Sequence, residues 1–114
     1  MSVPIACTLS AGEVVDRVEE WRSFFATSID AAVMPEVDSL RLQLKDDAAV
    51  LVAAADLARR EVTCCAFFDF SIAIESSRSW LVIQVPTEAS EILAGLAGHL
   101  PGGIPVEVQI AGGS

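Results

Sequence analysis

The residues of this sequence that could do chemistry are concentrated in the stretch REVTCCAFFDF, which covers 60–70. Two adjacent cysteines, Cys64 and Cys65, stand there between a helical pattern and three phenylalanines, and the third cysteine of the chain is Cys7. Thiolate sulfur is the preferred ligand of soft ions, so three thiols could form a trigonal site for Hg(II), As(III) or a similar ion. Glu61, one helical turn before the pair, could accept a thiol proton or supply an oxygen ligand.

Helical geometry separates the two adjacent sulfurs. Neighbouring residues on an α-helix point about 100° apart, so Cys64 and Cys65 cannot grip one ion until the helix ends. Cys65 continues an apolar helix face and is expected to point into the core, whereas Cys64 follows Leu57 and Glu61 and is expected to reach out. A helix C-terminus withholds from a thiolate the stabilisation that an N-terminus gives, which argues against a highly activated redox thiol.

Three interpretations of the cysteines stay open. The first is soft-ion binding by Cys7, Cys64 and Cys65 with Glu61 as a further ligand, which requires Cys7 to lie beside the end of the helix. The second is packing, because reduced cysteine behaves as a small buried hydrophobe. The third is redox chemistry through a disulfide between Cys7 and one of the pair. A structural zinc site is not expected, because zinc normally takes four ligands and the chain has no Cys-x-x-Cys motif.

The sequence shows no catalytic constellation. It has no Ser/His/Asp arrangement, glycine-rich phosphate loop or paired-carboxylate motif, so we expect a non-enzymatic domain with no catalytic residues. If the cysteines only pack, the alternative is a small-molecule or partner-binding module. A groove between helices and sheet, lined by Trp21, Phe25 and Phe68, would then suit an apolar ligand.

Hydrophobic periodicity predicts the elements that position these residues. From Val14 to Ile29, apolar residues recur at steps of three and four, which is typical of an amphipathic helix. Asp46 or Asp47 can cap the helix that carries the cysteine pair. The expected elements, in chain order, are a strand over 3–9, a helix over about 11–30, a strand over 39–45, a helix over 47–65, strands over 67–75 and 79–85 that form a hairpin, a helix over 87–97 and a strand over 104–110.

This order, β-α-β-α-β-β-α-β, predicts an α+β fold. We expect a two-layer sandwich with three helices on one face of a mostly antiparallel sheet. The domain is expected to span 1–110 and to be followed by a flexible tail over 111–114. Alternation within the first strand points Cys7 into the core.

The composition narrows the expected environment and partners. The net charge is −9 and no cluster of Lys or Arg forms a basic patch, so direct nucleic-acid binding is not expected. No apolar run approaches the roughly 20 residues that span a bilayer, so no membrane association is expected. An odd number of cysteines without a secretory signal predicts reduced thiols in the cytoplasm. An open sheet edge near 104–110 would allow a homodimer.

Two segments of the chain resemble a known small domain. IACTLSAGEVVDRVEEW and ARREVTCCAFFDFSIAIE are similar to a thiol domain of high-GC bacteria with a CC-x-FF-x-F motif, found alone or appended to MerR-type, heavy-metal-responsive regulators. The resemblance covers about 5–22 and 58–97. Its motif maps onto Cys7, Glu61, Cys64, Cys65, Phe67, Phe68 and Phe70. The resemblance implies an accessory or sensor domain for mercury or related soft metals, and a separate regulator protein as partner, because this chain lacks a helix-turn-helix.

Overall fold

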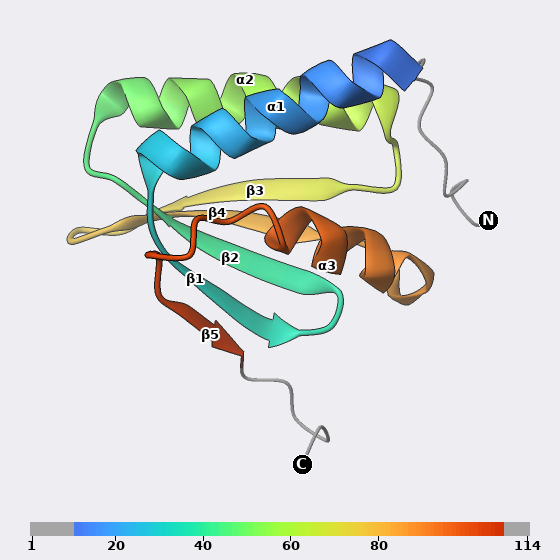
Figure 1. The fold of residues 1–114 in the computed structure, drawn as a ribbon. Coiled ribbons are helices and arrows are strands. Elements are labelled where there is room, and N and C mark those ends of the chain that lie inside the picture. Colours follow the sequence, from blue (N-terminus) through green and yellow to red (C-terminus); the bar gives the residue numbers. More distant parts are fainter. Residues whose placement is uncertain (1–10, 109–114) are drawn as a thin grey trace.

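The computed structural model describes residues 11–108, and in that range it has an α+β fold with three α-helices and a five-stranded sheet (Figure 1). The elements are α1 (Ala11–Ser28), β1 (Ile29–Glu36), β2 (Ser39–Leu44), α2 (Ala48–Cys64), β3 (Asp69–Ile74), β4 (Ser79–Gln84), the 3₁₀ turn η1 (Thr87–Ala89), α3 (Ser90–Ala97) and β5 (Val106–Val108). The predicted strand over 3–9, with Cys7, and the predicted tail over 111–114 lie outside the described residues. None of the helices within 11–108 is long and apolar enough to cross a membrane.

The sheet has the strand order β3-β4-β2-β1-β5 and is mixed. The pairs β1–β2, β2–β4 and β3–β4 are antiparallel, whereas β5 pairs in parallel with β1. The predicted mostly antiparallel sheet is therefore corrected to a mixed one. The physical reason is the connection through α3, which returns the chain to the far edge of the sheet in the direction of β1.

The strand β1 was missed by the sequence prediction. Its residues, 29–36, include Ala31, Ala32 and Pro35, which have low strand propensity, and Ile29 continues the helical stripe of α1. The structure instead ends α1 at Ser28 and pairs Ile29 with Leu44 of β2. The observed order within 11–108 is therefore α-β-β-α-β-β-α-β, and β1 and β2 form a hairpin of their own.

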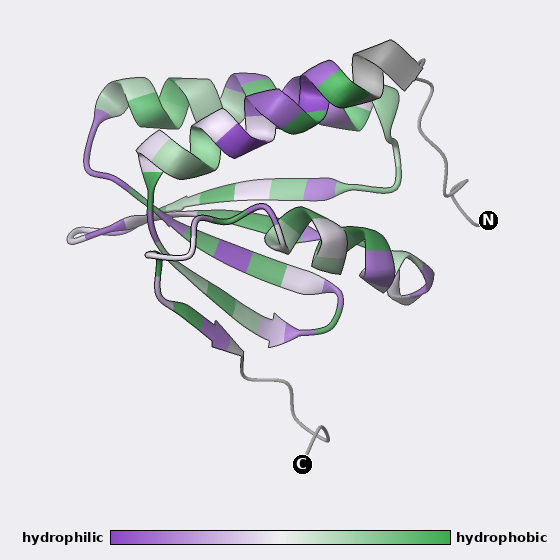
Figure 2. Cartoon of the chain, viewed as in Figure 1, coloured by the Kyte–Doolittle hydropathy of each residue, from purple (hydrophilic) through white to green (hydrophobic). Residues whose placement is uncertain are grey.

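One hydrophobic core contains residues of the three helices and of the sheet. Leu40, Leu42 and Leu44 of β2 alternate with more polar residues, and their side chains are buried. They belong to one cluster with buried residues of α1, α2 and α3, among them Phe25, Leu57 and Leu93 in turn. Figure 2 shows the alternation as hydrophobic and hydrophilic bands along the strands.

The helix α2 ends at the cysteine pair, a few residues before the start of β3. The side chain of Asp47 accepts a hydrogen bond from the backbone N–H of Ala49 at 2.8 Å, so Asp47 is the N-cap. At the other end, the N–H of Cys65 donates to the carbonyl of Glu61 at 2.7 Å, and the N–H of Phe68 then donates to the carbonyl of Cys65 at 3.1 Å. The chain therefore turns between the cysteine pair and β3.

Candidate thiol site

The two adjacent cysteines point into different surroundings. Cys65 is the C-cap residue of α2 and has 0% of its surface exposed, within the hydrophobic core. Its sulfur is disulfide-bonded. Cys64, the last residue of α2, is half-buried and carries a thiol. The predicted division, with Cys65 facing the core and Cys64 reaching out, is confirmed.

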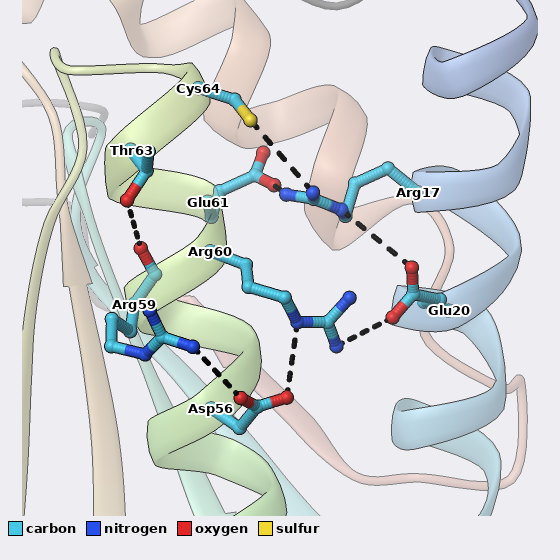
Figure 3. Close-up of polar contacts among 8 residues, drawn as sticks. All are labelled: Arg17, Glu20, Asp56, Arg59, Arg60, Glu61, Thr63 and Cys64. Carbon is cyan, nitrogen blue, oxygen red and sulfur yellow. Dashed lines mark hydrogen bonds and ion pairs between the residues drawn. The ribbon is translucent and has the colours of Figure 1, made fainter.

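The half-buried thiol lies beside an arginine from the other long helix. Arg17 of α1 donates from Nη1 to Glu61 Oε2 at 2.6 Å and from Nη2 to Cys64 Sγ at 3.9 Å (Figure 3). The side chains of Arg17 and Glu61 are only 12% and 10% exposed. The long distance to sulfur reflects the larger radius and weaker acceptor strength of a thiol. One guanidinium thus joins the carboxylate and the sulfur, which lie one helical turn apart.

Electrostatics hold Arg17 in its charged form. Burial lowers the pKa of its guanidinium, but the hydrogen bond and charge of Glu61, followed by those of Cys64, outweigh burial and raise it. A charged arginine that is largely removed from water requires such partners. Glu61 was a candidate from the sequence, whereas the role of Arg17 was missed. Several charged residues flank the apolar positions of this helix in the sequence, and no local pattern distinguishes Arg17 from them.

Further ion pairs extend this contact along the two helices. Arg17 Nε lies 3.8 Å from Glu20, and Arg60 Nη2 of α2 lies 2.6 Å from the other oxygen of Glu20. Arg60 also contacts Asp56 at 3.0 Å, as Figure 3 shows. These outer residues are more exposed than Arg17 and Glu61, so water screens them more strongly. The Arg17–Glu61–Cys64 contact is therefore the enclosed end of a polar row between α1 and α2.

The predicted pocket residues lie in the core. Trp21, Phe25 and Phe68 are all buried and belong to the single hydrophobic cluster. Trp21 lies 5.6 Å from Phe25 and 6.0 Å from Phe70 between ring centres, and Phe68 stacks on Phe70 at 5.6 Å. Among the described residues, the buried Nε1 of Trp21 has no hydrogen-bond partner. These contacts give the three aromatic residues packing partners on the helices and on β3.

A surface cavity of about 570 Å³ lies elsewhere, in the groove between α1 and α2. Its lining includes Phe24 and Leu57 at the base and a majority of polar or acidic residues around them, such as Asp16, Glu19 and Glu20. Trp21, Phe25 and Phe68 are not among the residues that line this cavity.

Metal ligation by all three cysteines would require Cys7, which lies outside the residues that the structure describes. Within residues 11–108, no group of three or more His, Cys, Asp or Glu side chains is arranged to hold a metal ion. Cys64 and Glu61 are brought together, and Cys65 lies next to them in sequence but within the core. The predicted contact with Cys7 stays a prediction.

Comparison of the chain with protein-family models, with curated proteins and with solved structures finds no match.

Proposed function

We propose that this chain is a non-enzymatic cytoplasmic thiol domain that binds or senses a soft metal or metalloid ion such as Hg(II) or As(III). The observation that carries the proposal is that the half-buried Cys64 thiol and the carboxylate of Glu61 both accept hydrogen bonds from the guanidinium of Arg17. Soft ions prefer thiolate sulfur, and Glu61 supplies an oxygen one helical turn away. The resemblance to a domain of MerR-type regulators supports the same class and a separate regulator as partner.

The contact with Arg17 gives binding a route to a structural change. An ion bound to the Cys64 sulfur would bring positive charge next to the guanidinium of Arg17. Like charges at this distance repel, and the ion also competes for the carboxylate of Glu61. Binding would therefore displace Arg17 and loosen α1 from α2. In this proposal the helices form one layer of a two-layer sandwich and shift over the sheet.

Additional sulfur ligands depend on the redox state. The Cys65 sulfur is disulfide-bonded, and a disulfide sulfur is not a thiolate ligand. Reduction would release thiols for the predicted set of Cys7, Cys64 and Cys65. We therefore expect the fully reduced protein to bind a soft ion more tightly than the oxidised protein.

Native mass spectrometry tests this function directly. Reduced and oxidised protein would be offered Hg(II), As(III), Zn(II) and Cu(I), each in turn, and Cys64→Ser would be compared with the exposed control Thr63→Ser. We expect the reduced wild type and Thr63→Ser to retain Hg(II) or As(III), and Cys64→Ser to lose that retention. Failure of reduced protein to retain any of the four ions at sub-micromolar affinity would refute the proposal.

Tryptophan fluorescence tests the coupling separately, with all proteins carrying Trp80→Phe so that Trp21 is the one tryptophan of the sequence. Trp21 lies one turn after Arg17 on α1, so loosening of this helix changes the surroundings of its indole. We expect the ion to alter the emission of the wild type and of Arg22→Ala, an exposed control on the same helix. In Arg17→Ala the ion should still bind, but the change in emission should be small. An equal change in all three proteins would contradict a role for Arg17.

A redox switch is a second candidate, and the disulfide at Cys65 favours it. Reducing compartments keep structural thiols reduced, so a disulfide formed there is transient and responds to oxidants. Thiol titration under reducing and oxidising conditions distinguishes this candidate. The titrated number of thiols should rise on reduction, and an equal number under both conditions would exclude a switch.

A further inference from the structure

The strand β3 presents unpaired backbone groups at one edge of the sheet, within the part of the chain that the structure describes. The N–H of Glu75 donates to the carbonyl of Arg78 at 2.8 Å, and β3 pairs with β4 in regular register from that point. Antiparallel pairing alternates, so the N–H and C=O groups of Phe70, Ile72 and Ile74 point away from β4. The edge therefore offers three residues with outward donors and acceptors.

The surroundings of this edge are apolar and hollowed. A groove of about 390 Å³ runs between α2 and β3. Its helix side is lined by Ala55, Ala58 and Val62 together with the polar residues Arg59 and Thr63. Ile74 is 72% exposed and Val52, on α2, is 70% exposed. From Phe70 to Ile74 the strand has no charge, no proline and no lysine, the residues that commonly protect a sheet edge.

We propose that β3 is a homodimer interface, at which the β3 strands of two copies pair in antiparallel fashion and continue the sheet. This proposal is independent of the proposed function. A second copy is favoured as the occupant because the edge is complementary to itself. A two-fold axis perpendicular to the sheet keeps corresponding faces together, so the side chains of Phe70 and Ile72 from each copy meet on the helix side.

Charge selects the register of this pairing. If the axis passed through Ile72, Asp69 of one copy would lie opposite Glu75 of the other, and like charges directly opposite are destabilising. With the axis at Ser71, Asp69 lies opposite Ala73, and Phe70 exchanges two backbone hydrogen bonds with Ile72. The second register avoids the repulsion and uses the outward groups of Phe70 and Ile72 in both copies. It also places the uncharged residues Phe70, Ser71 and Ile72 at the centre of an interface between two chains that each carry a net charge of −9, with Asp69 at its ends.

The groove beside the strand suits the incoming side chains. An added strand would place its own Phe70 and Ile72 over Ala55 and Ala58, whose small side chains leave the groove open. The exposed Arg59 at the rim pairs with Asp56 of the same helix at 3.4 Å. The residues of the added strand that approach this rim, Phe70 and Ile72, are uncharged, so Arg59 keeps Asp56 as its partner. The interface thus buries apolar surface and leaves Arg59 paired with Asp56.

A cross-link at the two-fold axis tests the register. In the proposed dimer the two copies of Ser71 face each other as a non-hydrogen-bonded pair, with Cα atoms about 4.5 Å apart. We expect Ser71→Cys in the full chain to form a covalent dimer under mild oxidation, at a level well above wild type. Ala73→Cys is the matched control, because its two copies would lie several residues apart. Equal cross-linking of Ser71→Cys, Ala73→Cys and wild type would overturn this register.

Association in solution tests the edge itself. Sedimentation of the full chain should show a dimer, and Ile74→Lys should raise its dissociation constant by about tenfold or more, because Ile74 flanks the paired residues at each end and the change brings two charges to the rim of an apolar interface. Ile74 is exposed in the single chain, so its replacement should leave the far-UV circular dichroism unchanged. The matched control is Val106→Lys at the opposite edge, where Val106 is 48% exposed.

The outcomes separate the occupants of the edge. A dimer that Ile74→Lys weakens and Val106→Lys leaves intact supports pairing through β3. A dimer weakened only by Val106→Lys places the interface at the other edge and overturns the proposal. A wild-type protein that stays monomeric also overturns it.

Discussion

The Arg17–Glu61 ion pair joins α1 to α2 with little exposure of either side chain. Removal of one partner from such a pair leaves the other charge largely buried without compensation. The pair is also linked to the candidate function through Cys64, so its energetic contribution matters for the response to an ion. It is therefore the first contact to test at the scale of single residues.

We expect Glu61→Gln to lower the free energy of unfolding by about 2 kcal/mol, because the amide keeps the shape but leaves Arg17 without a countercharge. Urea denaturation at neutral pH measures this change. Asp56→Asn is the control, because Asp56 pairs with exposed arginines and should cost about 0.5 kcal/mol or less. A smaller loss for Glu61→Gln than for Asp56→Asn would show that the enclosed pair contributes no special stability.

The raised pKa of Arg17 fixes the pH dependence of its contribution. A group whose pKa is higher in the folded protein stabilises it below the pKa of the unfolded chain, and the contribution is lost as the pH rises through the folded value. For arginine both values lie at strongly alkaline pH. We therefore expect the stability difference between wild type and Arg17→Ala to be constant from pH 7 to about pH 10. Urea denaturation across this range would reveal a drift if Arg17 lost its proton earlier.

At the scale of elements, α2 depends on its cap as well as on its apolar face. The side chain of Asp47 satisfies the N–H of Ala49 at the start of the helix. We expect Asp47→Ala to lower the free energy of unfolding by about 1 kcal/mol. Asp46→Ala is the matched control, because its neighbour Asp47 already occupies the cap. Thermal unfolding followed by circular dichroism measures both, and an equal shift in melting temperature would contradict the assignment.

Elements with strong local signals were predictable, and those set by distant partners were not. The helix α2 and the β3–β4 hairpin follow from periodicity within their own residues. The strand β1 depends on pairing with β2 and β5, which outweighs the weak strand propensity of its alanines and Pro35. In the candidate site, the directions of Cys64 and Cys65 follow from helical geometry. The contact of Arg17 with both Glu61 and Cys64 joins residues far apart in sequence, and no local pattern encodes it.

At the scale of the whole molecule, a single core makes distant elements depend on one another. Leu42 lies on the central strand β2 and is completely buried. We expect Leu42→Ala to cost about 3 kcal/mol, because the lost burial is combined with a cavity that the packed layers cannot fill. Val52→Ala, at an exposed position on α2, should change stability by less than about 0.5 kcal/mol. Chemical denaturation of both variants checks this contrast, and similar losses would argue against one shared core.

The parallel pairing of β5 with β1 has a consequence for synthesis of the protein. Its three residue pairs join the early strand to a segment that leaves the ribosome only after α2, the second hairpin and α3. While the chain is growing, the outer edge of β1 therefore lacks the β5 strand. The N–H of Ala32 can donate to the carbonyl of Pro105 only after that residue has been synthesised. Unpaired strand edges of this kind are sites of aggregation in incomplete chains. The strand β5 thus completes the sheet only after the other described elements have been synthesised. We therefore expect chains truncated before Pro105 to bind chaperones.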